Sequence, residues 1–127
     1  MTARASAAEQ TPGNTQNFTD AVRAGSFVFV SGQASVDDDG CLWPGSFREE
    51  MERSIARLAL ALGETGLGLA DVVKVTCYVQ DPADIPEYNR IYREQFGAPL
   101  PARTTLTECL GGVVKFEIDA VAYTGER

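Results

Sequence analysis

The order of strand and helix patterns predicts an α+β fold, in which a mixed β-sheet carries two helices packed on one face. Strand-like segments precede, separate and follow only two helical patterns. Because two helices cannot supply a crossover after every strand, a doubly wound parallel sheet is not expected. The length of 127 residues fits one domain, and 44% hydrophobic residues fit a conventional core. We expect a flexible N-terminal tail over residues 1–14 and a single domain over residues 15–127.

A first strand is predicted over residues 27–32, where β-branched and aromatic residues run up to a glycine. A turn is predicted over residues 37–40, because the Asp-Gly pair at its end suits a hairpin. A helix follows, since Ser46 and Glu49 have the spacing of a capping box. Its apolar face consists of Met51, Ile55, Leu58 and Leu62. The chain leaves this helix among three glycines, Gly63, Gly66 and Gly68.

A second strand is predicted over residues 71–81. One face of it would carry Val73, Val75, Cys77 and Val79, and the opposite face Val72, Lys74, Thr76 and Tyr78. A shorter helix is expected from near Asp84 to Gly97, with apolar spacing at Ile85, Tyr88, Ile91, Tyr92 and Phe96. Two last strands are predicted over residues 103–110 and 115–124, joined by Gly111-Gly112.

Composition excludes several classes of function. The net charge of −7 argues against nucleic acid as a partner, because phosphate binding needs a basic surface. The chain contains no histidine, so Ser-His-Asp catalysis, Cys-His catalysis and histidine-dependent metal sites are absent. The 3 cysteines are far apart and form no metal or disulfide pattern. The sequence shows neither a membrane-spanning run nor a secretory signal, so we expect a cytoplasmic protein.

One face of the predicted sheet has no helix to cover it. The residues assigned to that face include several apolar ones: Val72, Tyr78, Val121 and Tyr123. An exposed apolar sheet face usually marks a partner surface, and closed symmetric self-association is its commonest solution. We therefore expect a homo-oligomer.

Two residues of the last strands are candidates for chemistry. Glu117 lies among apolar strand residues, where an unpaired carboxylate is costly to bury. Arg103 begins the preceding strand and offers the planar fork that binds a carboxylate through two hydrogen bonds. If the two strands are antiparallel neighbours, these side chains would form an anion anchor beside a proton-handling group. A structural salt bridge, or two solvated side chains, would fit the same pattern.

The segment Ser31-Gly32-Gln33 is a second candidate, because glycine at a strand end lets the backbone approach a ligand. An ordinary turn glycine is the alternative interpretation. Asn89 has the pattern of an exposed helix position, and Phe18 has that of a core or interface residue.

Several motifs together resemble the RidA (YjgF) family. They are residues 28–33 with their Ser-Gly-Gln, the Asp-Val-Val-Lys-Val-Thr of residues 71–76, the Tyr-Asn-Arg-Ile-Tyr of residues 88–92, the Pro-Ala-Arg-Thr of residues 101–104, and the Lys-Phe-Glu-Ile-Asp-Ala of residues 115–120. Their order and spacing are similar to the family's from Phe18 to Ala122.

This resemblance implies a chorismate-mutase-like α+β fold and a homotrimer with ligand clefts between its subunits. Active members hydrolyse enamines and imines, such as 2-aminoacrylate, to 2-keto acids and ammonia without a metal or organic cofactor. By position, Arg103 matches the arginine that holds the substrate carboxylate. Glu117 matches the glutamate that positions or activates water, and Ser31, Gly32 and Asn89 match the cleft.

The sequence departs from the family pattern inside the cleft. Phe18 stands where the family has a tyrosine, and Thr105 stands where it has a cysteine. Gly111-Gly112 replaces a Leu-Pro turn. These changes leave open which imine is the substrate. They also leave open a non-catalytic protein that binds a keto acid or regulates a partner, although a pure carboxylate binder would not need Glu117.

Overall fold

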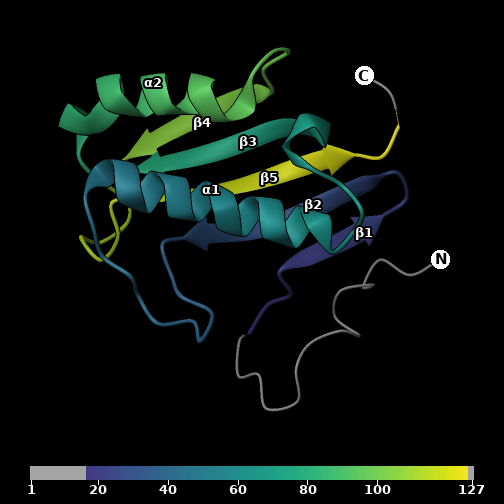
Figure 1. Ribbon diagram of the computed structural model, residues 1–127, viewed down its shortest axis with the longest axis horizontal. Helices are drawn as coiled ribbons and strands as arrows, with labels where there is room; N and C mark the ends of the chain where they lie inside the picture. The colour runs from purple at the N-terminus through teal and green to yellow at the C-terminus, as the bar shows by residue number, and fades with distance from the viewer. Residues whose placement is uncertain (1–16, 126–127) are drawn as a thin grey trace.

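The computed structural model describes residues 17–125, in which five strands form one mixed sheet with two helices on one face (Figure 1). The strands are β1 (Ala21–Ala24), β2 (Phe27–Ala34), β3 (Val72–Val79), β4 (Ala102–Thr107) and β5 (Phe116–Tyr123). The helices are α1 (Phe47–Gly63) and α2 (Ile85–Phe96), with short 3₁₀ turns at Leu69–Asp71 and Pro82–Asp84. The predicted fold class is confirmed. The predicted tail, residues 1–14, lies outside the described residues.

The strand order across the sheet is β1-β2-β5-β3-β4. Strands β3 and β4 pair in parallel, and every other neighbouring pair is antiparallel. The parallel pair follows from the connection between the two strands, since α2 serves as the crossover helix of a β-α-β unit. The last strand then inserts between β2 and β3, so β5 is the centre of the sheet.

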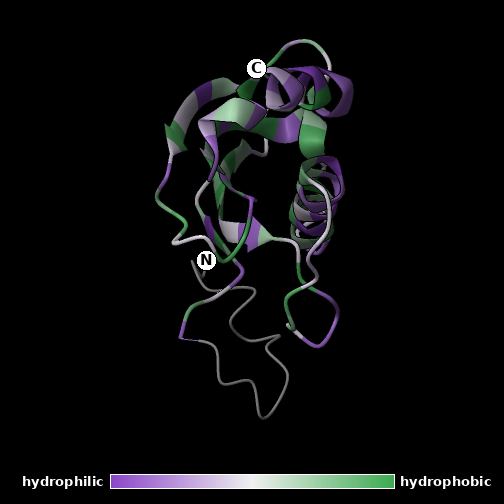
Figure 2. Ribbon diagram, turned by 90° about the vertical axis from the view of Figure 1, so that its left-hand side faces the viewer, coloured by the Kyte–Doolittle hydropathy of each residue, from purple (hydrophilic) through white to green (hydrophobic). Residues whose placement is uncertain are grey.

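The start of α1 has the capping box that the sequence predicts. The Glu49 N–H donates to Ser46 Oγ at 3.1 Å, and the Ser46 N–H donates to the Glu49 carboxylate at 2.8 Å. The predicted apolar face is buried against the sheet, with Met51, Ile55, Leu58 and Leu62 at most 1% exposed. The core thus lies between the sheet and the two helices, as the edge-on view shows (Figure 2).

The faces of β3 differ from the prediction at its start. A register shift between Val72 and Lys74 inserts one extra residue, so Val72 turns to the helix face and is fully buried. Val73 is only half-buried, although alternation had placed it with Val75, Cys77 and Val79. The assignment of Val72 to the open face was therefore wrong. Four valines in β3 made the two phases of alternation hard to distinguish.

Strand β1 was missed by the sequence prediction. It pairs with β2 in a hairpin from Ala21↔Val30 to Ala24↔Phe27, which leaves only Gly25-Ser26 as its loop. Gly25 has a φ of 61°, a conformation that glycine adopts without strain. With only 4 residues, the strand is too short to show a clear period. The predicted turn at residues 37–40 is present, closed by the bridge Val36↔Leu42.

The sheet face opposite the helices is open in the single chain and partly apolar. Phe27, Phe29 and Leu106 are 42–47% exposed there. Tyr78, Val121 and Tyr123 are half-buried on the same face, as expected from the sequence. Within the described residues, neither helix is long and apolar enough to cross a membrane.

Candidate active site

Arg103 lies on the edge strand β4 and faces the same side as the helices. It is in register with Val75, which pairs in turn with Ala120, and both of these neighbours are buried beneath the helices. The Arg103 guanidinium stacks against two rings of α2, with its carbon 4.8 Å from the Tyr88 centroid and 4.7 Å from the Tyr92 centroid. Among residues 17–125, none of the ion pairs involves Arg103. The guanidinium is exposed and keeps its charge free for an anion.

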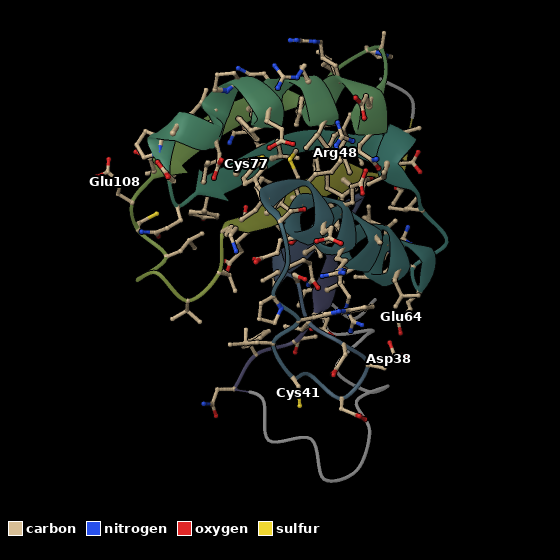
Figure 3. All side chains as sticks on the ribbon, turned by 60° about the vertical axis from the view of Figure 1, so that its left-hand side comes forward. Asp38, Cys41, Arg48, Glu64, Cys77 and Glu108 are labelled. Carbon is tan, nitrogen blue, oxygen red and sulfur yellow. The ribbon has the colours of Figure 1, made fainter. Side chains whose placement is uncertain are left out.

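Thr105 follows Arg103 by two positions, and so it lies on the same face of β4. Its hydroxyl is 2.6 Å from the Tyr88 hydroxyl. Cys77 is in register with Thr105 and lies beneath α2, where Figure 3 labels it. Burial raises the pKa of Cys77 to about 11, so its thiol stays protonated and is a poor nucleophile. Strand β4 and helix α2 thus form one candidate half-site, to which β4 contributes Arg103 and Thr105.

Glu117 lies on the opposite face of the sheet. It pairs with Tyr78, which also faces away from the helices, and its neighbours in β5 alternate between buried and half-buried. Its carboxylate lies over the backbone of Gly32, where a Cβ atom at Gly32 would overlap Oε2 and lie 3.0 Å from Cδ. Gly32 sits in a bulge of β2, because the register with β5 shifts between Val30 and Gln33. A residue without a side chain at this bulge makes room for the carboxylate.

The surroundings of Glu117 favour its protonated form. Partial burial, and then the nearby Asp119 carboxylate, raise the pKa of Glu117 above that of an ordinary glutamate. Asp119 accepts a hydrogen bond from the Tyr78 hydroxyl at 2.8 Å, and that bond contributes most to raising the pKa of Tyr78 to about 12. A carboxyl group with a raised pKa can take up and release a proton closer to neutral pH.

A cavity of about 230 Å³ adjoins Gly32. Phe18 lines it and is 54% exposed. Ser31 does not point a free hydroxyl into this region, since it donates to the Thr19 carbonyl at 2.6 Å, while its N–H donates to the Asp20 carbonyl at 2.8 Å. Both bonds hold the Phe18 segment beside the bulge. The cavity is completed by Asp20, Gln33, Ala34, Val36, Gly40 and Arg57.

The structure does not bring Arg103 and Glu117 together within one chain. The sequence had suggested antiparallel neighbours, but β3 lies between β4 and β5, so the two strand axes are about 10 Å apart. Arg103 aligns with Ala120, three positions along β5 from Glu117, and the two side chains are on opposite faces of the sheet. The expectation that adjacent strands place them side by side was wrong. One chain therefore presents two separate candidate half-sites.

Asn89 follows Tyr88 in α2 and is half-buried. The helical spacing puts it on the same side of α2 as Tyr92 and Phe96, toward the β4 edge. In the sequence, Tyr88 and Tyr92 were identified only as part of the apolar spacing of the second helix, and their contact with Arg103 was missed. The four-residue spacing of Tyr88 and Tyr92 marks a shared helix face, but nothing in the sequence indicates that β4 runs beneath it.

Residues 8–124 match the family model described as endoribonuclease L-PSP. A RutC family protein of Pyrococcus abyssi is 36% identical over 117 residues, which is 91% of this chain and 92% of that protein. A 2-iminobutanoate/2-iminopropanoate deaminase of Dermatophagoides farinae is 29% identical over 90 residues, 70% of each chain.

The fold is shared with solved structures. The crystal structure of Escherichia coli TdcF with bound serine superposes with a TM-score of 0.79 and 26% identity, covering 92% of this chain and 95% of that one.

Proposed function

The chain belongs to the endoribonuclease L-PSP family, which is the RidA (YjgF) family, and from this premise we propose that it is an enamine/imine deaminase. The substrates would be 2-imino acids and their enamine tautomers, and the products 2-keto acids and ammonia. The observation that carries the proposal is the pair of half-sites. One offers a cation without an ion-pair partner among the described residues, and the other a carboxyl group of raised pKa beside a backbone bulge.

Completion of the site requires a second copy of the chain. The two half-sites differ, so the interface at which they meet is heterologous. A heterologous interface that closes forms a ring, with one site at every contact. The open apolar face supplies a surface for such association, because Phe27, Phe29 and Leu106 are exposed in the single chain. We propose a homotrimer, in which Arg103 of one copy and Glu117 of the next share each site.

The protein needs to supply little activation of the substrate, because an iminium carbon is already electrophilic. Arg103 would hold the substrate carboxylate through two parallel hydrogen bonds. Glu117 would orient a water molecule and accept its proton as the water oxygen bonds to the iminium carbon. The same proton, returned to the nitrogen of the resulting carbinolamine, lets the carbon–nitrogen bond break. Glu117 takes up the hydroxyl proton as the carbon–oxygen bond becomes the carbonyl of the keto acid, and ammonia leaves.

Neither half-site offers what RNA cleavage requires. The chain has no histidine and a net charge of −7, whereas a ribonuclease needs a basic surface and a matched acid and base. A second candidate function is the binding of a keto acid or amino acid without turnover. The serine bound in the TdcF structure favours this alternative, because serine is a small molecule with a carboxylate.

The proposed activity is tested by ammonia release. Imino acids are generated in the assay by an amino-acid oxidase from amino acids with side chains of several sizes, with enough oxidase that imine formation does not limit the rate. Faster keto-acid and ammonia formation than in buffer supports the deaminase. Binding of keto acids with no acceleration for any side chain contradicts it and favours the binding protein.

A further inference from the structure

The Arg103 half-site contains an arrangement that the proposed chemistry does not use. Two buried tyrosines of α2 lie beneath an exposed guanidinium on the neighbouring strand. We infer that Tyr88 and Tyr92 are positioning residues, whose rings hold Arg103 in the one direction from which it receives a carboxylate. The inference rests on the proposed function only in taking Arg103 as the carboxylate anchor.

The guanidinium contacts the two rings almost equally, at 4.8 Å from Tyr88 and 4.7 Å from Tyr92. The ring centroids are 6.1 Å apart and the rings are tilted by 53°, so together they form an angled platform. A cation above an aromatic ring is attracted to the negative face of the ring. Contact with two rings of different tilt restrains the guanidinium plane more than contact with one would.

The platform itself is fixed by its surroundings. Tyr88 is fully buried and Tyr92 is 3% exposed. The Tyr88 ring lies 6.0 Å from the Phe116 ring, and the Tyr92 ring 4.8 Å from the Phe96 ring. The Tyr88 hydroxyl is also tied to Thr105 by the 2.6 Å hydrogen bond. Arg103 therefore stacks on a surface that belongs to the core and does not move with the ligand.

A preset direction matters because arginine is otherwise flexible. An exposed arginine side chain loses rotamer entropy when it is fixed in one direction. No carboxylate among the described residues forms an ion pair with Arg103, so only the rings restrain it before a ligand arrives. Stacking on a ring leaves the edge of the guanidinium free, and the edge carries the N–H groups that bind a carboxylate.

The hydroxyl groups of Tyr88 and Tyr92 allow the contribution of the rings to be distinguished from that of the polar atoms. Among the described residues, the Tyr92 hydroxyl is buried and has no hydrogen-bond partner. Such a group contributes no binding energy and costs stability when it is desolvated. At this position Arg103 uses the ring alone. Phenylalanine should therefore replace Tyr92 without loss, whereas an aliphatic residue should not.

The test compares Tyr92→Phe with Tyr92→Leu by calorimetric titration with pyruvate. We expect Tyr92→Phe to bind pyruvate as the wild type does, and Tyr92→Leu to bind about 3- to 30-fold more weakly, as loss of a cation–π contact implies. In turnover, the same loss should raise KM for the imino acid and leave kcat nearly unchanged, because a carboxylate held at a distance from the reacting carbon is bound equally in substrate and transition state.

A second measurement guards against a merely destabilised Tyr92→Leu protein. The Arg103 Nε proton, assigned through its absence in Arg103→Ala, should be shifted upfield by the rings in the wild type and in Tyr92→Phe. Tyr92→Leu should weaken this shift at temperatures well below its melting point. Equal pyruvate affinity in Tyr92→Leu and the wild type would overturn the inference, as would equal weakening by both substitutions. A wild type that binds pyruvate but releases no ammonia would contradict the deaminase alone.

Discussion

The Glu117 carboxylate occupies the space that a side chain at Gly32 would fill. This relationship joins the bulge in β2 to the start of β5 and places a carboxyl group of raised pKa over the backbone of Gly32. Because the bulge lies between Val30 and Gln33, Gly32 interrupts the regular pairing where the carboxylate sits. The position of the proposed catalytic group thus depends on the absence of a side chain on the neighbouring strand.

Gly32→Ala tests this dependence. The added Cβ would lie 3.0 Å from Glu117 Cδ and closer still to Oε2, so the carboxylate must move away. The carboxylate lies at the flexible end of the Glu117 side chain, so it can move without disturbing the fold. We therefore expect deaminase activity to fall at least tenfold while the melting temperature changes little. Gly63→Ala is the matched control, because a Cβ there meets no atom within 4 Å and should leave activity intact. Full activity in Gly32→Ala would show that the observed carboxylate position is not required.

Glu117→Gln should separate catalysis from binding. The amide keeps the size of the carboxyl group but cannot accept a proton from water. We expect kcat to fall by about 10²- to 10⁴-fold, the usual contribution of a general acid–base group. Pyruvate affinity measured by calorimetry should change much less. Substantial hydrolysis by Glu117→Gln on the best substrate would remove the glutamate from the proton-handling role.

The rate should depend on pH through Glu117. If the carboxylate form activates water, activity falls as the pH drops through the pKa of Glu117, which burial and Asp119 raise above the usual carboxyl range. Asp119→Asn removes the negative charge but leaves the burial, so the acidic limb of the kcat profile should move to lower pH. The shift should be seen at imine concentrations that saturate the enzyme. An unmoved limb would mean that another group titrates.

Arg103→Ala should abolish binding of 2-keto acids. The loss of a charge-assisted, two-point contact costs on the order of 2–4 kcal/mol. Arg90→Ala is the control, because Arg90 is also exposed and its removal changes the net charge by the same amount. Pyruvate titration should show no binding to Arg103→Ala and ordinary binding to Arg90→Ala. Equal loss in both variants would point to the overall charge of the chain instead of the anchor.

The elements of this fold could be predicted where local chemistry determines them. The capping box at Ser46 and the apolar face of α1 have no alternative interpretation, and both were confirmed. The stop of α2 at Gly97 is equally local, since Gly97 has a φ of 63°. Local patterns of this kind depend on neighbours within one or two turns, so the sequence contains all of the information that they require.

Strand order could not be predicted in the same way. The eight-residue connection between β4 and β5 contains Gly111-Gly112, which suits a hairpin, and the two strands were expected to pair. The β3-α2-β4 crossover instead places β4 beside β3, and β5 pairs with β2 and β3. The choice between these arrangements depends on contacts distant in sequence. It also decides that Arg103 and Glu117 face opposite sides of the sheet, so the division of the proposed site could not be predicted from the residues assigned to it.

That division leads to the last prediction, which concerns assembly. If each site takes Arg103 from one copy and Glu117 from the next, a mixture of Arg103→Ala and Glu117→Gln chains contains some sites with both wild-type residues. Random mixing within a ring should restore about one quarter of the sites. The variants should be unfolded and refolded together so that copies exchange, and each variant treated alone should stay inactive. Sedimentation should show that wild type and mixture are trimers of the 13.7 kDa chain. If one chain supplied both residues, every site in the mixture would lack one of them, and no activity would return. A monomer at micromolar concentration would contradict both the trimer and the shared site.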